Sequence, residues 1–528
     1  MSDKDLVNMF HTAIDFGTTN TVVCTVVDGE LREIDIQQGK PIIPTLIVPG
    51  KKEIVWSKSS NKTVHCIKLL LGRRLCDLKI NGLEIDNFGC ELIDQDGEIC
   101  AKDGEKKYSV VDMVSTFFSQ IKKTIEERLG KKSSGELYLS VPTRFNSLQR
   151  EALMKAASRA GFTSVKLVNE PTAAALGYIK DSSIKSEQTV LVYDFGGGTF
   201  DVSILRLSNQ GANISVLATG GDNNIGGERI DHDLGKRLIE EFKKEHRNAE
   251  FKDRNKNRGC YGKFEDIICR AKENIADHDS IAISCETVLT KKSRERLEDE
   301  EELSMIDLTP SMLDEVVKKY VDKSMEIVKA TLHRAFPTVS IDKLADKITM
   351  VLPVGGASSM KYVKTALIDY FGKQKVKGIE KPKWPTVRGC AYMIKGEQLN
   401  EIIVQECTSY DYGFRCSGEV FECVIPKGTP LPLKEPVLKL FKTHISDQTE
   451  IKTFICEGDA DDSMKINKSF TSEKITIDLS ALKKGKEDIY FYLSLEIDVN
   501  GMFEVKASTY PKKEVFWTKR LEMNKVRV

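Results

Sequence analysis

The chain has 528 residues, of which 40% are hydrophobic and 30% charged, and these values indicate a globular protein of two to four domains. Its 79 basic and 79 acidic residues give a net charge of zero, which argues against nucleic acid or an anionic membrane as a partner recognised through bulk charge. The thirteen cysteines form no CxxC pair, so we expect neither a redox motif nor a zinc ribbon, and reduced thiols in the cytoplasm.

Targeting signals and common active-site motifs are not found. No signal peptide opens the sequence, no apolar run is long enough for a membrane span, and Asn524 to Val528 form no retention or lipidation signal, so we expect no membrane partner. The patterns GxxxxGK(S/T), GxGxxG after a strand, HExxH and GxSxG do not occur. The sequence therefore has to be interpreted through other motifs.

The first predicted element is an apolar strand that ends at Asp15. A tight turn, Gly17-Thr18-Thr19-Asn20, follows it, and residues 21–27 resume the strand pattern. Glycine lets backbone N–H groups approach phosphate oxygens, hydroxyls add donors, and the aspartate can hold a cation. The segment therefore predicts a phosphate-binding hairpin.

Two amphipathic helices are predicted after this hairpin. Residues 114–129 carry apolar side chains at helical spacing and are followed by Gly130. Asn146 and Ser147 can cap a second helix, which runs to about Ala160.

A second copy of the phosphate-binding hairpin then follows. The buried strand 190–193 leads to Asp194, the turn Gly196-Gly197-Gly198-Thr199 comes next, and a strand resumes at Asp201. Two copies imply two related half-domains that face one nucleotide.

Two further features precede residue 400. The charged run 291–302 is interpreted as a solvated loop. Residues 348–354 form a third buried strand that breaks at Gly355 and Gly356, which predicts another turn for phosphate or base.

Beyond about residue 400 the pattern becomes antiparallel β. Residues 489–499 and 503–507 alternate strictly around Asn500-Gly501, which predicts a hairpin with a type I′ turn, and residues 475–479 form another strand. The apolar segment Glu401 to Gln405 connects the two parts. It is either one more short strand or a segment that docks on a domain in one state and is released in another.

Six segments together resemble the seventy-kilodalton heat-shock chaperone family, in an order and spacing that match almost the whole chain. They are IDFGTTN (14–20), VNEPTAAALGY (168–178), VYDFGGGTFDVSIL (192–205), GGDNNIGGERID (220–231), VLPVGGAS (351–358) and IDVNGMFEVKAS (497–508). The resemblance implies an α/β fold: an actin-like, two-lobed ATPase domain with duplicated ribonuclease-H-like halves, followed by an antiparallel β-sandwich. We expect the nucleotide-binding domain at 1–400, a linker at 401–409 and a substrate-binding sandwich at 410–528, with the family's helical lid absent.

The resemblance also assigns site residues. It implies ATP or ADP with Mg²⁺ as cofactors, the metal ion being held by Asp15, Asp194 and Glu170, partly through water. Lys68 would reach the γ-phosphate and the attacking water, Glu170 would orient water, and Pro142 with Arg150 would relay the nucleotide state to the linker. The catalytic set is Lys68, Glu170, Asp194, Thr199 and Asp201. The nucleotide-binding set is Gly17, Thr18, Thr19, Asn20, Gly196, Gly197, Gly198, Thr199, Gly226, Gly227, Glu228, Lys272, Gly355, Gly356, Ala357 and Ser358.

The side that would bind the base departs from the family pattern. Lys272 matches, but Glu273 and Ser359 stand where the family has arginines that stack on adenine, and Cys269 and Ala276 replace an acid and a serine. A stacked guanidinium contributes roughly 0.5–2 kcal/mol, and a lost polar contact costs about 0.5–1.5 kcal/mol. We therefore predict weak ATP binding or altered base selectivity.

The resemblance implies an ATP-dependent molecular chaperone of protein folding and the stress response. It would couple ATP hydrolysis to the binding and release of unfolded or extended polypeptides, with J-domain co-chaperones and nucleotide-exchange factors as partners. The alternative is a catalytically weak or inactive family member that acts as a regulator or co-chaperone, which the altered base contacts and the absent lid favour. A sugar or glycerol kinase on the same fold is disfavoured by the β module and the linker.

Overall fold

The computed structural model describes residues 9–36, 39–55, 62–80, 88–182, 186–209, 212–299, 303–379, 382–399, 402–417, 420–443, 448–460, 464, 471–482, 489–498 and 500–520. Glu401, the end of the charged run at 300–302 and the segment Asn524 to Val528 lie outside the described residues. No helix of the described chain combines the length and the apolar character needed to cross a membrane.

The first lobe is built on a sheet with the strand order β3-β2-β1-β8-β9, and β4 also pairs with β2. Its strands are β1 (Met9–Phe16), β2 (Asn20–Val27), β3 (Glu30–Glu33), β4 (Ile42–Pro44), β8 (Lys132–Val141) and β9 (Ser164–Asn169). A small three-stranded sheet, β5 (Glu91–Gln95), β6 (Glu98–Asp103) and β7 (Lys106–Ser109), and the short helices η1 (Ile67–Leu70) and α2 (Leu75–Ile80) complete this lobe. Because β1 and β2 are antiparallel neighbours, the turn between them lies at the end of the sheet.

The two helices predicted for this lobe are confirmed. Helix α3 (Val110–Leu129) buries its apolar face and ends at Gly130, whose φ of 60° is left-handed. Helix α4 (Ser147–Arg159) begins at Asn146, whose side chain accepts the backbone N–H of Gln149 in a capping box. The cap fixes the start of α4 after β8. The first residue of α4, Ser147, also contacts Glu457 of the β-sandwich.

The second lobe repeats the arrangement with the strand order β15-β10-β11-β12-β16-β19. Its strands are β10 (Gln188–Phe195), β11 (Phe200–Ser208), β12 (Asn213–Asp222) and β15 (Met350–Val354), joined at the edge by β16 (Ile403–Cys407) and β19 (Pro430–Leu431). The helices are α6 (Gly227–Glu245), α7 (Arg258–Asn274), α9 (Pro310–Ala335) and α10 (Lys361–Phe371), with the small hairpin β13 (Ile281–Ser284) and β14 (Met305–Leu308). The second glycine turn is therefore confirmed as a hairpin between antiparallel strands.

The interpretation of the charged run as a loop is wrong. Residues 291–299 form helix α8 (Lys291–Asp299), in which Ser293 and Leu297 are buried. The side chain of Leu297 joins the hydrophobic core of the second lobe. One buried leucine in a nine-residue helix leaves a sequence that is almost entirely polar, so the pattern conceals the helix.

Two helices cross between the lobes. Helix α5 (Glu170–Ser182) packs against the second sheet and α11 (Trp384–Leu399) packs against the first sheet, and the two helices contact each other. The crossing is close, because a Cβ at Gly389 would lie 1.8 Å from the carbonyl oxygen of Ala173, and one at Gly177 would lie 2.0 Å from that of Pro385. Glycine is required at both positions because the backbones themselves are in contact.

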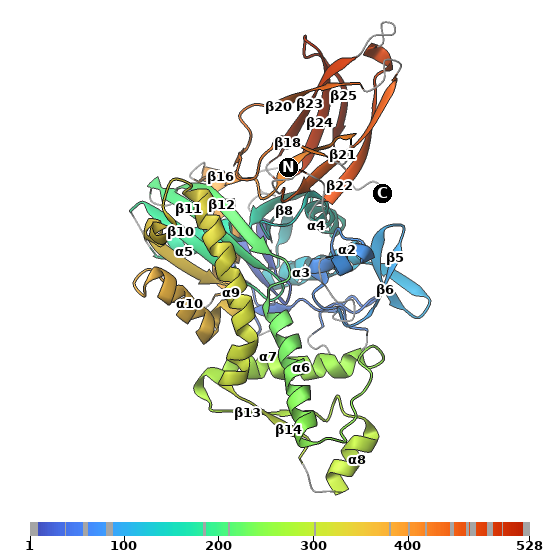
Figure 1. The fold of residues 1–528 in the computed structure, drawn as a ribbon, viewed down its shortest axis with the longest axis vertical. Coiled ribbons are helices and arrows are strands. Elements are labelled where there is room, and N and C mark those ends of the chain that lie inside the picture. Colours follow the sequence, from blue (N-terminus) through green and yellow to red (C-terminus); the bar gives the residue numbers. More distant parts are fainter. Residues whose placement is uncertain are drawn as a thin grey trace.

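A β-sandwich follows the two lobes and lies against the first lobe beside α4 and β8 (Figure 1). One sheet has the order β18-β17-β21-β22 and the other β20-β23-β24-β25. The strands are β17 (Asp411–Arg415), β18 (Phe421–Ile425), β20 (Val437–Lys442), β21 (Glu450–Gly458), β22 (Thr471–Asp478), β23 (Tyr490–Ile497), β24 (Phe503–Thr509) and β25 (Val515–Arg520). Alternate residues of these strands form one apolar core between the sheets.

The predicted hairpin at Asn500-Gly501 is confirmed, but the predicted turn type is wrong. A type I′ turn needs positive φ at both central residues, whereas only Gly501 of this pair has it, at 78°. Gly501 N–H donates to Asp498 O, and Asp498 N–H donates to Met502 O, each at 2.9 Å, so the strands are joined through a longer loop than a two-residue type I′ turn. Asn500 instead uses its side chain to accept the N–H of Leu167 in the first lobe, at 3.0 Å.

The connecting segment forms a strand. Strand β16 pairs in parallel with β12, with Ile403 opposite Asn213, and in antiparallel with β19 of the following module. The linker thus docks on the edge of the second sheet, and of the two interpretations the strand is confirmed.

Candidate functional site

The two glycine turns face each other and have the same local geometry. In the first turn Gly17 N–H donates to Asn20 O at 3.0 Å, and in the second Gly196 N–H donates to Thr199 O at 3.0 Å. A Cβ at Gly197 would lie 1.8 Å from Thr19 Oγ1, so the first turn touches the second. This contact places the hydroxyls of one hairpin beside the backbone N–H groups of the other.

Two more glycine segments join them. At the start of α6, Gly227 N–H donates to Gly196 O at 3.0 Å and Glu228 N–H donates to Gly197 O at 2.8 Å. After β15, Gly355 has a φ of 81°, and a Cβ there would lie 2.6 Å from Asp194 Oδ1. The chain next turns through η7 (Gly356–Ser359), which contains Ala357 and Ser358. Four segments far apart in the sequence therefore meet around Asp194.

Four carboxylates and one lysine form the centre of this site; Glu170 and Asp201 are buried, and Asp15 and Asp194 are half-buried. Lys68 Nζ lies 2.5 Å from Glu170 Oε1, and both side chains are buried. Burial, and after it the charge of Glu170, raises the pKa of Asp15 to about 7, and the same two causes raise the pKa of Asp201 to about 6. The pKa of Asp194 is raised well above its ordinary value by burial and by Glu170. The cluster thus holds more negative charge than Lys68 can balance.

Hydroxyl groups orient two of these carboxylates. Ser140 Oγ donates to Asp15 Oδ1 at 2.6 Å, and Thr143 Oγ1 donates to Asp201 Oδ1 at 2.7 Å. Both hydroxyls come from β8 and the chain just after it. These hydrogen bonds orient the two carboxylates and favour their ionised form.

The site fits a divalent hard cation and phosphate. Clustered carboxylate oxygens are the ligands that Mg²⁺ takes, and its charge would offset the burial and the mutual repulsion that raise the pKa values of these aspartates. Thr19 Oγ1 is shielded from solvent and has no hydrogen-bond partner among the described residues. Buried hydroxyls normally have a partner, and a bound phosphate oxygen would provide one. The glycine turns supply backbone N–H groups of the kind that bind phosphates.

The expected base side is arranged differently. Lys272 Nζ lies 2.6 Å from Asp231 Oδ1 with both side chains buried, and donates to Gly227 O at 3.3 Å. Burial lowers the pKa of Lys272, but Asp231 raises it above its ordinary value. Glu273 and Ser359 are exposed. The ammonium group of Lys272 therefore contacts Asp231 and Gly227 of the same lobe.

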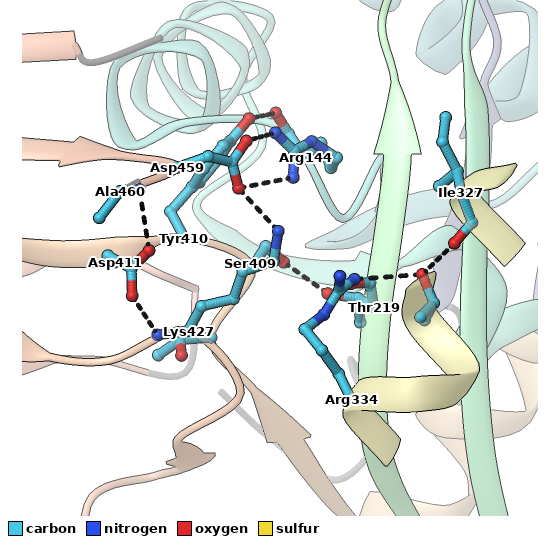
Figure 2. Close-up of polar contacts among 12 residues, drawn as sticks. Arg144, Thr219, Ile327, Arg334, Ser409, Tyr410, Asp411, Lys427, Asp459 and Ala460 are labelled. Carbon is cyan, nitrogen blue, oxygen red and sulfur yellow. Dashed lines mark hydrogen bonds and ion pairs between the residues drawn. The ribbon is translucent and has the colours of Figure 1, made fainter. Parts of the chain in front are cut away.

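A polar interface connects this site to the β-sandwich (Figure 2). Arg144, which directly follows Thr143, forms an ion pair with Asp459, and Lys427 Nζ lies 2.7 Å from the same carboxylate. Tyr410 O–H donates to Arg144 O at 2.7 Å, and the Arg144 guanidinium lies 4.5 Å from the centre of the Tyr410 ring. Burial opposes ionisation of Asp459, but Arg144 and Lys427 hold its pKa well below the usual range.

A second set of contacts covers the start of α4 and the linker. Glu457 accepts from the N–H of Ser147 at 2.8 Å and from its hydroxyl at 2.7 Å. Thr172 Oγ1 donates to Glu406 Oε1 at 2.8 Å. Arg150, predicted as part of a relay with Pro142, donates to Pro142 O at 3.4 Å and to Asn169 Oδ1 at 2.9 Å.

Sequence reasoning missed most of the sandwich side of this interface. Asp459, Glu457 and Lys427 are ordinary polar residues in the sequence, and no local pattern singles them out. Arg144 lies between Pro142 and Arg150, both of which were predicted, and that position is the signal that could have indicated it.

Comparison with known proteins gives two matches. The family model described as Hsp70 protein matches residues 12–520. The sequence is 28% identical over 510 residues to Chaperone protein DnaK of Stenotrophomonas maltophilia (strain R551-3), an alignment that covers 94% of this chain and 76% of that protein. The match confirms the expected fold class, a two-lobed actin-like ATPase domain followed by a β-sandwich.

Proposed function

Because the chain belongs to the Hsp70 family, we propose that it is a Mg²⁺-dependent ATPase and a molecular chaperone that couples ATP hydrolysis to the binding and release of unfolded or extended polypeptides. One observation carries the proposal: the buried Lys68–Glu170 pair lies among three aspartates, of which Asp201 is buried and Asp15 and Asp194 are partly exposed, beside two facing glycine turns. The similar protein from Stenotrophomonas maltophilia is named as a chaperone, which supports the same role.

Each side chain of the site has a task in this proposal. Asp15 and Asp194, with Glu170, would hold a Mg²⁺ ion, which supplies positive charge to the phosphates during transfer. The hydroxyls of Thr18, Thr19 and Thr199 and the N–H groups of the glycine turns would bind phosphate oxygens.

The remaining residues would act on water and phosphate charge. Lys68 would stabilise the charge on the γ-phosphate and hold the attacking water. Glu170 and Asp201 would orient that water by accepting its hydrogen bonds. The short Lys68–Glu170 contact, 2.5 Å in a buried site, keeps the ammonium group in one place.

The path to the polypeptide-binding module would begin at Asp201. Its carboxylate accepts a hydrogen bond from Thr143, and the next residue, Arg144, forms an ion pair with Asp459 of the sandwich. A change of charge at Asp201 would therefore alter a hydrogen bond one residue away from the domain interface. This short connection supports coupling between hydrolysis and polypeptide release.

A single-turnover ATPase assay tests the proposal. We expect hydrolysis in the wild-type protein, a rise with an unfolded peptide or a J-domain protein, and loss in Lys68→Met. Lys318→Met is the matched control, because Lys318 lies on the exposed face of α9 and its partners, Asp322 and Tyr362, lie outside the proposed site. Absence of hydrolysis in the wild-type protein under all these conditions would contradict the proposal.

A second function, a regulator of the same family with little turnover, has its own supporting observation. The positions expected to stack on adenine hold Glu273 and Ser359, both exposed, and Lys272 is tied to Asp231. We propose weak ATP affinity, reduced by a few orders of magnitude relative to a site that keeps the two stacked arginines together with the acid and the serine replaced here by Cys269 and Ala276.

Titration calorimetry with ATP, ADP and GTP measures this affinity. Glu273→Arg combined with Ser359→Arg should restore tighter ATP binding by about 10-fold or more. Wild-type binding as tight as in the arginine variant would contradict the weakened base site. Weak binding without hydrolysis would favour the regulator over the chaperone.

Partners, compartment and domain limits complete the proposal. We propose J-domain co-chaperones and nucleotide-exchange factors as partners, and domain limits at 1–400, 401–409 and 410–528. All thirteen cysteines lie among the described residues and none forms a disulfide, which supports a reducing compartment such as the cytoplasm.

A further inference from the structure

A cluster of potential metal ligands lies beside the second glycine turn and shares no residue with the aspartates assigned to Mg²⁺. One ligand atom from each of His65, Cys66 and Glu228 lies within 4.8 Å of the other two. The three residues line a cavity of about 50 Å³, together with Gly197, Gly198 and Asn223. This volume exceeds the roughly 10–15 Å³ that one water-sized probe needs.

The chemistry of the three ligands selects zinc over magnesium. A thiolate, an imidazole and a carboxylate are all ligands of Zn²⁺, whereas Mg²⁺ prefers oxygen ligands and its waters. Cys66 Sγ and His65 Nδ1 are 3.6 Å apart. Two ligands with bonds of about 2.3 Å for sulfur and about 2.0 Å for nitrogen lie about 3.6 Å apart on a tetrahedral zinc ion. The pair therefore has the spacing of two zinc ligands.

The backbone around the pair is shaped to bring it into the cavity. Cys66 has a φ of 54°, a left-handed conformation that a cysteine adopts only at a cost in strain. Gly89 has a φ of 78°, and a Cβ there would lie 2.7 Å from the His65 ring, so only glycine leaves room for the imidazole.

The third ligand comes from the opposite lobe. Glu228 lies in the first turn of α6, whereas His65 and Cys66 directly precede η1, the short helix that carries Lys68. Asn223 Oδ1, from the chain before α6, is shielded from solvent and has no hydrogen-bond partner among the described residues. A water on the metal ion could donate to this oxygen, since three protein ligands leave one position of a tetrahedral zinc open.

We propose that His65, Cys66 and Glu228 form a Zn²⁺ site that joins the two lobes and fixes the turn bearing Lys68. The site uses none of the aspartates assigned to Mg²⁺, but its ligand Glu228 and the lining residues Gly197 and Gly198 also belong to the expected nucleotide-binding set, so Zn²⁺ binding is measured without nucleotide. The sequence motifs gave no indication of it, because its ligands are one HisCys pair and a glutamate 162 residues after Cys66.

Cobalt spectroscopy on the full-length, metal-stripped protein provides the test. Co²⁺ should bind in one equivalent and produce an intense near-ultraviolet band from thiolate-to-cobalt charge transfer. Competition with a chromophoric chelator then measures Zn²⁺ affinity. Cys66→Ser should remove the charge-transfer band and weaken Zn²⁺ binding at least about 100-fold, beyond the 10–100-fold that loss of an outer-shell partner costs.

Two further variants and a control make the test specific. His65→Gln and Glu228→Gln should each weaken Zn²⁺ binding at least about 10-fold, and Glu228 is only half-buried, so its variant is expected to fold. Cys76→Ser, which removes an exposed thiol, should leave the band and the affinity unchanged. Circular dichroism confirms folding of each variant.

Three results would overturn the proposal. The first is a Co²⁺ complex without a thiolate band. The second is a band or a Zn²⁺ affinity that Cys66→Ser does not change. The third is full affinity in Glu228→Gln, because a site confined to one lobe would not join the two.

Discussion

Replacing Lys68 by methionine should strongly destabilise the nucleotide-free ATPase domain. Lys68 is almost fully buried, lies 2.5 Å from Glu170, and its charge lowers the pKa of Asp15, Asp194 and Asp201. Removing one partner of a buried ion pair costs about 3–5 kcal/mol, because the other charge is left uncompensated. Three further carboxylates lose their counter-charge here, so we expect a value at the upper end of that range.

Replacing the opposite partner should cost less. In Glu170→Gln, Lys68 still has the negative charges of three aspartates nearby. The substitution also removes the charge of Glu170, which after burial is the largest cause of the raised pKa values of these aspartates. We expect a loss of about 1.5–3 kcal/mol, the scale of one hydrogen bond to a charged group. The double variant Lys68→Met with Glu170→Gln should be more stable than Lys68→Met alone.

Urea unfolding without nucleotide measures these differences. The transition of the ATPase domain is compared between variants rather than treated as one two-state process for the whole chain. Lys318→Met, which removes an exposed pair on α9, should change stability by less than about 0.5 kcal/mol. The reasoning is refuted if Glu170→Gln is as destabilised as Lys68→Met, or if Lys68→Met matches the Lys318 control.

Three other perturbations test the interface and the helix crossing. Burial lowers the pKa of Lys427 from 10.5 to about 8. Between about pH 8 and 10.5 the unfolded chain therefore binds a proton at this residue that the folded chain has lost, so stability and melting temperature should rise with pH. Lys427→Met should abolish this rise in melting temperature. Glu457→Ala leaves two buried donors of Ser147 unsatisfied and should cost about 1–3 kcal/mol, seen as faster proteolysis at the linker; an unchanged rate would contradict this. Gly389→Ala should cost about 1–3 kcal/mol in thermal unfolding, whereas Gly378→Ala, with open space around it, should have no such effect.

The sequence predicted the elements whose signals are local. The two glycine hairpins, the capped helix after Asn146 and the strands of the sandwich each depend on residues close together in the chain, and the structure contains all of them. Periodicity and turn residues are sufficient to predict such elements, because the residues that form each element are neighbours in the sequence.

Features that depend on distant residues were missed. Helix α8 has one buried apolar side chain, Leu297, which packs on the core of the second lobe, and its buried Ser293 accepts the N–H of Glu250. The turn at Asn500 departs from the hairpin rule while its side chain accepts the N–H of Leu167, more than three hundred residues earlier in the chain. The interface at Asp459 and the cluster at His65 likewise bring together ordinary residues from separate elements.

The docked linker covers an edge strand of the second lobe. Strand β16 covers the outer edge of β12, and β19 covers β16 in turn. An uncovered edge strand presents N–H and C=O groups on which another chain can add a strand. Release of the linker would open the edge at residues 213–215 and free Ile403, which is already 65% exposed. A chain held in the released state would therefore be the more prone to aggregate, so a chaperone built this way would itself need protection while its sandwich is undocked.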